Sequence, residues 1–427
     1  MQRDSKYEKM IRILREELVP ALGCTEPIAI AYTAAKAREV LGAFPERMVV
    51  ECSGNIIKNT KGVIVPNTGN LRGIKASAIA GALAGDSSKK LEVLTAINDE
   101  QIEKTRELLR SDFCVEKYLD TPEVLHIVVT AVNRQDAVRV ELKKHHTGIV
   151  RITKNDEVVF EAEGADGPSD DSLTDRGFLS VRDIYEFART VDISDVRDLL
   201  DKQITYNLRI AEEGLSHSYG AGVGSTLIKE FGDKDAKILA RAYAAAGSDA
   251  RMSGCVLPVV INSGSGNQGM TVSLPVIVYA RMLKVSDEKL YRALVLSNLV
   301  AIHQKTKIGR LSAYCGAVSA ACGSGAAITY LYDGDLEQIE QTITNTLANI
   351  SGIVCDGAKP SCAAKISSAV DAAIMGHYMA LNHKTFHAGE GLVKEDIEKT
   401  IQSIGRLASQ GMKETDQEIL SIMTDNQ

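Results

Sequence analysis

The chain has 427 residues, of which 44% are hydrophobic and 25% charged, a balance typical of a folded globular protein. Its length exceeds what a single core usually supports, so more than one packed unit is expected. A formal net charge of -7 and an aromatic content of 5% argue against a nucleic-acid partner. The N-terminal residues mix charges of both signs, and the longest apolar run, Met270 to Leu283, is interrupted by Ser273, Pro275 and Arg281. We therefore expect no signal peptide, no membrane span and a cytoplasmic protein.

The first part of the chain predicts two helices followed by strands. Apolar residues recur at helical spacing between Tyr7 and Leu18, which predicts an amphipathic helix. The residue types of Cys24-Thr25-Glu26-Pro27 are those of a helix start, so Cys24 is expected at the N-terminus of a second helix. The β-branched runs between residues 48 and 70 predict a strand hairpin, and the small residues of 75–85 predict a closely packed helix.

The middle of the chain changes to an α+β pattern. Strands are predicted at 91–97, 125–132, 148–154 and 157–163, with a charged helix ending at Leu109 and a Gly, Asp and Ser-rich linker at 164–177. Beyond residue 181 the chain is mostly helical and rich in small residues. The predicted fold class is therefore α+β: a mainly helical catalytic domain formed by residues 1–86 and 178–427, with an inserted small α+β domain at 87–177.

Two loops rich in Gly and Asn are candidate binding segments. VPNTGN at 65–70 and NSGSGNQG at 262–269 each follow a β-branched run and precede a helical stretch. Their backbone N–H groups could receive a carboxylate, with Asn67, Asn262 and Asn267 as polar contacts to a substrate. Turn chemistry alone would produce the same sequences, because Asn and Gly tolerate turn dihedrals.

Apart from Cys24, the eight cysteines fall into two groups. Cys52, Cys114 and Cys255 are scattered among apolar neighbours and are expected to be core thiols. The second group lies late in the chain and consists of Cys315, Cys322, Cys355 and Cys362. A disulfide framework is not expected in a reducing compartment, which favours metal binding or catalysis. The spacing alone leaves a zinc site, an iron-sulfur cluster and inert thiols all open.

Four long motifs carry a family resemblance: GCTEPIAIAY at 23–32, SGNIIKN at 53–59, GIKASAIAGALAGD at 73–86 and CDGAKPSCAAK at 355–365. Together they resemble the L-cysteine desulfidase family, relatives of the iron-sulfur L-serine dehydratase α domain. The resemblance implies a four-iron four-sulfur cluster with Cys315, Cys355 and Cys362 as ligands, leaving Cys322 as a bystander. It also implies a catalytic cysteine in the GCTEP motif, which is Cys24.

The expected activity is β-elimination of L-cysteine to hydrogen sulfide, pyruvate and ammonia. An open iron would act as Lewis acid on the substrate sulfur. Cys24 would be the base, since a helix N-terminus acidifies a thiol. Lys305 and Lys307 could offset the cluster's negative charge or be solvated surface, and His217 and His303 are alternative proton donors or structural residues. The sequence lacks an SSSHT motif, and its tail LSIMTDNQ has no cysteine. Both absences favour cysteine over serine.

The sequence is also compatible with other functions. One alternative is an iron-sulfur L-serine dehydratase that binds a hydroxyl at the same iron. A second uses pyridoxal phosphate, although no lysine stands in a motif that demands it. The non-enzyme alternative is a zinc-stabilised helical protein or amino-acid sensor. The expected partners are a small-molecule substrate and further copies of the same chain, with no nucleic acid and no membrane.

Overall fold

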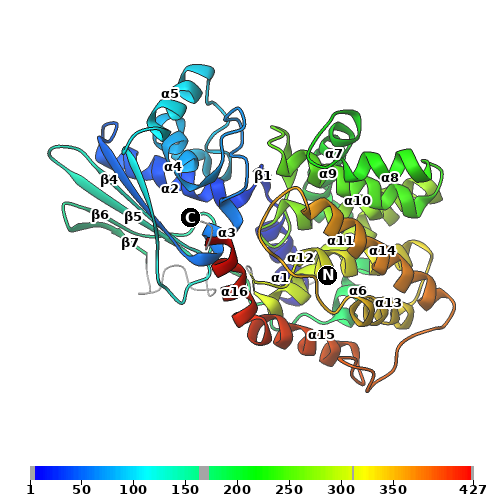
Figure 1. Cartoon of the computed structure of the whole chain (residues 1–427). Coiled ribbons are helices and arrows are strands. Elements are labelled where there is room, and N and C mark those ends of the chain that lie inside the picture. Colours follow the sequence, from blue (N-terminus) through cyan, green and yellow to red (C-terminus); the bar gives the residue numbers. More distant parts are fainter. Residues whose placement is uncertain (1–4, 163–172, 310–311, 425–427) are drawn as a thin grey trace.

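The computed structural model describes residues 5–162, 173–309 and 312–424, so most of the predicted linker at 164–177 lies outside the described residues. An α+β unit and a helical unit lie side by side (Figure 1). No helix within the described ranges is both long and apolar enough to span a membrane.

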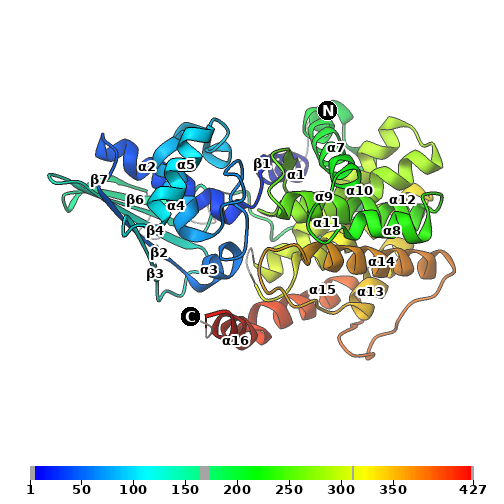
Figure 2. The ribbon, with the colours of Figure 1, turned by 45° about the horizontal axis from the view of Figure 1, so that its top comes forward.

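The α+β unit is a mixed sheet with helices on one face (Figure 2). Its six strands have the order β3-β2-β4-β5-β6-β7, with β2 and β3 parallel and the other neighbours antiparallel. Helix α2 packs on β4 and β5, α4 packs on α2, and α5 on α4. The elements are α2 (Thr25–Leu41), β2 (Arg47–Cys52), α3 (Gly54–Thr60), α4 (Gly73–Ala84), η1 (Ser87–Glu92), α5 (Asp99–Leu109), β3 (Cys114–Tyr118), β4 (His126–Val132), β5 (Ala137–Lys143), β6 (Ile149–Lys154) and β7 (Glu157–Glu161).

Alternating side chains explain why this sheet buries one face. In β5, Val138, Val140 and Leu142 are fully buried while the intervening residues are more exposed, as the two-residue period of a strand requires. The covering helices approach closely because their contacts are small residues. A Cβ atom on Gly81 of α4 would lie 2.2 Å from the carbonyl oxygen of Ala31 in α2. Glycine at this position therefore sets the helix spacing.

The helical unit is centred on α12, whose residues are almost all buried. It packs against α10, α11, α13 and α14, while the short pair β1–β8 joins the N-terminal segment to this unit. The elements are α1 (Ser5–Glu17), β1 (Pro20–Leu22), α6 (Val181–Thr190), α7 (Ile193–Ser216), α8 (Val223–Phe231), α9 (Ala236–Met252), β8 (Pro258–Val260), α10 (Gly266–Leu283), α11 (Asp287–Ile308), α12 (Gly316–Leu331), α13 (Leu336–Asn349), α14 (Cys362–Leu381), α15 (Ile397–Arg406), η3 (Leu407–Gly411) and α16 (Lys413–Thr424).

The mainly helical α+β class is confirmed, but the predicted hairpin is wrong. Strand β2 pairs with β3 and β4, and residues 63–72 instead form a turn closed by a bridge between Ile64 and Arg72. Pro66 cannot donate to a ladder, and Asn67 has a φ of 60°, so this run does not extend as a strand. The predicted strand at 91–97 is also wrong, because a 3₁₀ turn and further turns occupy it.

The hydrophobic cores also correct the proposed division of the chain. One core joins residues of α2, β2 and α4 to residues of β4, β5 and β6. A second core joins α1 to the helices that follow residue 178. The α+β unit therefore begins near residue 25 rather than at 87, because β2 is a central strand and α2 covers the sheet.

Candidate cysteine site

Two backbone segments of the helical unit place Cys315 and Cys355 side by side. The amide of Cys315 donates to the carbonyl of Ile353 at 2.8 Å, and the amide of Cys355 donates to the carbonyl of Ala313 at 2.7 Å. Cys315 is the N-cap of α12, and Cys355 begins the loop before α14. Both residues are partly exposed, and their thiols are close enough to shift each other's pKa.

The loop from Cys355 to Cys362 is held by charge and by close backbone packing. Asp356 forms ion pairs with Lys359 in the loop and with Lys365 in the first turn of α14. Gly357 has a φ of 98°, and a Cβ atom there would lie 2.3 Å from the carbonyl oxygen of Lys58. The loop therefore rests directly on α3 of the α+β unit, and glycine is required at that contact.

The surroundings of Cys355 favour its thiolate. The hydrogen bond from Cys315 lowers the pKa of Cys355 to about 6 against the opposing effect of burial, and the positive charges of Lys58 and Lys305 act in the same direction. The same hydrogen bond and burial raise the pKa of Cys315 well above its usual value. Burial raises the pKa of Cys362, which starts α14. The pair Cys315–Cys355 thus has one readily ionised thiol.

Cys24 lies beside this group, at the N-cap of α2. It shares a small apolar cluster with Cys362, in which Val63 and Met252 are the buried neighbours. Its thiol donates to Glu26 Oε2 at 3.0 Å. The structure therefore brings together all four cysteines that the resemblance singled out, from three separate helix starts and one loop.

The expected acidification of Cys24 is contradicted. Burial, followed by the negative charge of Glu26, raises the pKa of Cys24 well above its usual value, although the Arg251 charge acts in the opposite direction. Burial also raises the pKa of Glu26, but interactions with His146 and with the Cys24 thiol outweigh it and lower the value to about 2. Cys24 is 2% exposed, so loss of solvation outweighs the helix dipole. At rest Cys24 is a thiol held by a carboxylate.

The three predicted asparagines have different surroundings. The Asn67 amide donates to the carbonyl of Leu94, a contact that stabilises a turn. Asn262 is fully buried and donates to Asn298 Oδ1 at 2.9 Å. Asn267 Oδ1 accepts a hydrogen bond from Arg251 at 3.2 Å. Of the three, Asn267 bonds to a charged group next to Cys24, so it remains the better substrate-contact prediction.

The two lysines and two histidines considered from the sequence differ in their burial and partners. Lys305 is 5% exposed and acts electrostatically on Cys355, whereas Lys307 is exposed. His303 bonds to Glu398 at 2.7 Å, and His217 lies on the surface beside Glu213 at 3.1 Å. Both histidines thus have carboxylate partners of their own.

Sequence reasoning missed several residues of the site: Glu26, Lys58, His146, Arg251 and Gln268. Lys58 belongs to the SGNIIKN motif, but the sequence does not indicate that its side chain is 1% exposed and paired with Asp416. Gln268 is buried against Gly316, the residue after Cys315. These contacts join segments far apart in the chain and have no local pattern.

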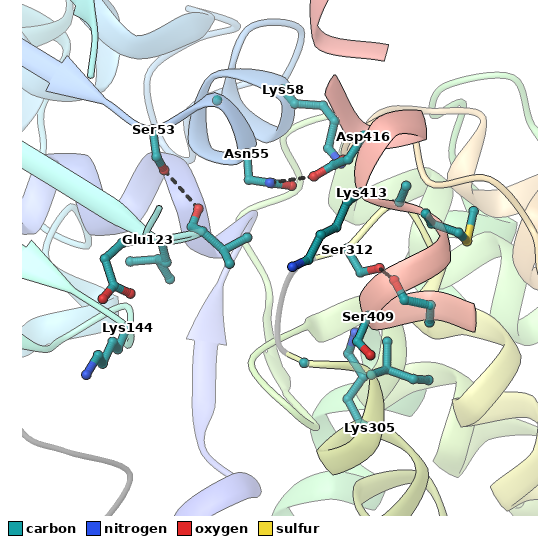
Figure 3. Close-up of a pocket in the computed structure, with 18 of the residues that line it drawn as sticks. Ser53, Asn55, Lys58, Glu123, Lys144, Lys305, Ser312, Ser409, Lys413 and Asp416 are labelled. Atoms are coloured by element: carbon teal, nitrogen blue, oxygen red, sulfur yellow. Dashed lines mark hydrogen bonds and ion pairs between the residues drawn. The ribbon is translucent and has the colours of Figure 1, made fainter. Parts of the chain in front are cut away.

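A cavity of about 780 Å³ opens between the two units (Figure 3). Ser53, Asn55 and Lys58 line it from the α+β unit, as do Glu123 and Lys144; Ser312, Lys305, Ser409 and Lys413 line it from the helical unit. Lys58 and Lys305 are the lysines that act on Cys355, and Ala313 in the lining bonds to the Cys355 amide. The cavity thus borders residues that contact or act on Cys355, while the four cysteines are not among its lining residues.

The donor set fits a metal cluster better than a single ion. Within the described part of the chain, no three His, Cys, Asp or Glu side chains are grouped around one ion-sized point. In a four-iron cluster with one open iron, three protein thiolates each bind a different iron, so the ligands need not surround one point. Cys315, Cys355 and Cys362 supply three thiols, with two lysines and the Gly357 amide to offset negative charge. These residues fit such a group.

Comparison with known proteins identifies the family. A family model described as the serine dehydratase alpha chain matches residues 88–421, so the chain belongs to the serine dehydratase alpha-chain family. Within it, the similar proteins are UPF0597 proteins. One from Lachnoclostridium phytofermentans is 61% identical over 98% of this chain and 99% of its own length. Others from Desulfitobacterium hafniense and Treponema denticola are 54% and 52% identical, each covering 98% of its own length and at least 98% of this chain. The family membership indicates a lyase-type enzyme.

We predict that Asp416→Asn destabilises the protein by about 3 kcal/mol, because it leaves the buried Lys58 ammonium without its charge partner. The free energy of unfolding in urea, measured on the full chain, checks this. The matched control is Glu107→Gln, which removes the carboxylate of an exposed pair with Lys104 and should leave the unfolding curve unchanged. Equal effects of the two substitutions would contradict the role assigned to Asp416.

Proposed function

We propose that the protein is an L-cysteine desulfidase that uses a four-iron four-sulfur cluster held by Cys315, Cys355 and Cys362. The observation that carries this proposal is the backbone pairing that sets Cys315 beside Cys355, with Cys362 and Cys24 adjacent. A serine dehydratase-type lyase acts on a small amino acid, and thiols placed in this way match the ligand set that the motifs imply. The inter-unit cavity is lined by Lys58 and Lys305, whose charges act on Cys355.

The chain's own residues account for the proton transfer. When bound, the cluster would supply an open iron that acts as a Lewis acid toward the substrate sulfur. Cys24 acts as the base only after its proton moves to Glu26 Oε2, which accepts its hydrogen bond at 3.0 Å. Because the pKa of Glu26 is about 2 and that of Cys24 is raised by burial, this transfer is uphill and the thiolate forms only transiently. The desolvated thiolate is a strong base, and the Arg251 charge stabilises it. The thiolate removes the α proton of L-cysteine, the electron pair forms the Cα–Cβ double bond, and the Cβ–S bond breaks. Sulfide leaves, and water converts the aminoacrylate to pyruvate and ammonia.

An L-serine dehydratase is the second candidate, because the family model carries that description. Side-by-side assays of anaerobically purified protein with L-cysteine and L-serine distinguish the two. We expect about four irons per chain, the content of a cubane cluster, and sulfide release from L-cysteine faster than pyruvate release from L-serine. Preference for L-serine would favour the second candidate. Stoichiometric zinc in an active preparation would contradict both.

We predict that Cys355→Ala and Cys362→Ala each lose the cluster, whereas Cys322→Ala keeps both iron and activity. Cys322 is fully buried within α12, in the core of the helical unit, and its thiol contacts Gln304 rather than the other thiols. Iron content and visible absorption of the anaerobic proteins are the measurements. If Cys322→Ala lost iron as completely as Cys355→Ala, the ligand assignment would be wrong.

Cys24 is the proton-transfer residue in this proposal, so Cys24→Ala should retain the cluster absorption while elimination falls by about a hundredfold or more. L-cysteine should still perturb the visible spectrum of the variant, since binding of the sulfur requires no loss of the α proton. Cys24→Ser should behave similarly, because a hydroxyl is far less acidic than a thiol. Loss of iron would make Cys24 a ligand, and near-normal turnover would leave it with a packing role.

A further inference from the structure

The guanidinium of Arg251 is a buried charge that lacks a carboxylate partner. Arg251 is 3% exposed and stands in the last turn of α9. Its Nη1 donates to Asn267 Oδ1 at 3.2 Å, while Nε has no hydrogen-bond partner. Among the described residues, no carboxylate forms an ion pair with it. A buried cation without an anion is costly, so the fold maintains this charge at the expense of stability.

The first turn of α10 packs directly against Arg251. A Cβ atom on Gly266 would lie 2.4 Å from Arg251 Nε, so glycine is what allows the guanidinium to occupy this position. The positive end of the α10 dipole lies here as well, which further favours a negatively charged ligand. The Arg251 guanidinium of α9 and the N-terminus of α10 therefore lie next to each other, and both favour a negative charge.

This region also adjoins the residues of the proposed reaction. The Arg251 charge acts on the Cys24 thiol. One residue after Asn267, Gln268 is 6% exposed with an unpartnered Oε1, and its amide packs against Gly316 beside Cys315. An unsatisfied buried donor thus lies near the proposed base, and an unsatisfied buried acceptor lies near a proposed cluster ligand.

We infer that Arg251 binds the α-carboxylate of the amino-acid substrate, with Asn267 orienting the guanidinium and Gln268 Oε1 accepting from the substrate ammonium group. This inference deepens the proposed function and rests on it for the identity of the substrate. A carboxylate bound to Arg251 Nε supplies the missing anion and satisfies the orphaned donor. Arg251 is therefore the residue that restricts the site to α-amino acids, in contrast to simple thiols.

The test measures binding of three probes by calorimetry to the anaerobic, iron-containing full chain. L-alanine carries a carboxylate and an ammonium group, 3-mercaptopropionate a carboxylate and a thiol, and cysteamine an ammonium group and a thiol. In Arg251→Gln, the affinities for L-alanine and 3-mercaptopropionate should fall at least tenfold, while that for cysteamine should change less than twofold. Arg251→Lys should fall between, because a lysine keeps the charge without the planar pair of donors.

The matched control is Arg241→Gln, on the same helix, whose guanidinium already pairs with Asp371 at 3.2 Å. It should leave all three affinities unchanged. Equal weakening of the three probes by Arg251→Gln, or no weakening of the two carboxylates, would overturn the inference, as would a wild-type protein that binds neither carboxylate. L-alanine needs neither sulfur nor iron. If Arg251→Gln selectively loses L-alanine binding and the wild-type protein releases no sulfide, the role of Arg251 in carboxylate binding is upheld and the desulfidase proposal is refuted.

Discussion

The antiparallel contact between residues 313–315 and 353–355 determines where the thiols of this protein lie. Its two backbone hydrogen bonds join the start of α12 to the loop before α14, and each segment ends in a cysteine. Without this contact, no backbone hydrogen bond would link Cys315 at the start of α12 to Cys355 in the loop before α14. The Asp356 ion pairs then fix the rest of the loop, which brings Cys362 to the same place. A ligand set for a cluster follows from a few main-chain contacts.

The second constraint is that the site forms where the two units meet. The helical unit supplies the three proposed ligands, whereas Cys24 and Glu26 start α2 of the α+β unit. Lys58 contacts both units. Gly357 of the cysteine loop packs against the Lys58 backbone carbonyl, and the Lys58 side chain forms an ion pair with Asp416 of α16. Figure 1 shows α16 lying against α3 at the end of the chain. The C-terminal helix thereby fixes a positive charge close to the Cys355 sulfur.

Much of the fold could be predicted because its signals are local. The amphipathic helix predicted between Tyr7 and Leu18 forms as α1, and β4, β6 and β7 follow their β-branched runs. The hairpin prediction failed because the partners of β2 lie about sixty residues or more along the chain, beyond the reach of a local pattern. Local turn residues around Pro66 resembled a strand end but belong to a loop.

The candidate site was predictable in its residue types more than in its electrostatics. Motifs placed the cysteines, and the structure brings them together. The helix N-terminus suggested an acidic Cys24, but burial and Glu26 reverse that direction. Lys58 can be buried because it pairs with Asp416, which lies 358 residues away in the sequence. Arg251 Nε is left without a hydrogen-bond partner by the way distant segments pack around it. A local sequence pattern predicts neither property, because both depend on the arrangement of distant segments.

Mössbauer spectroscopy of the iron-57-enriched anaerobic protein, before and after addition of L-cysteine, tests the central claim most directly. Three protein thiolates on four irons predict two kinds of iron in a ratio of about three to one, and L-cysteine should shift the minor component alone. The same titration with L-serine shows whether that iron prefers sulfur. A spectrum in which all irons are equivalent and unaffected by L-cysteine, or a protein that contains no iron-sulfur cluster, would contradict the account.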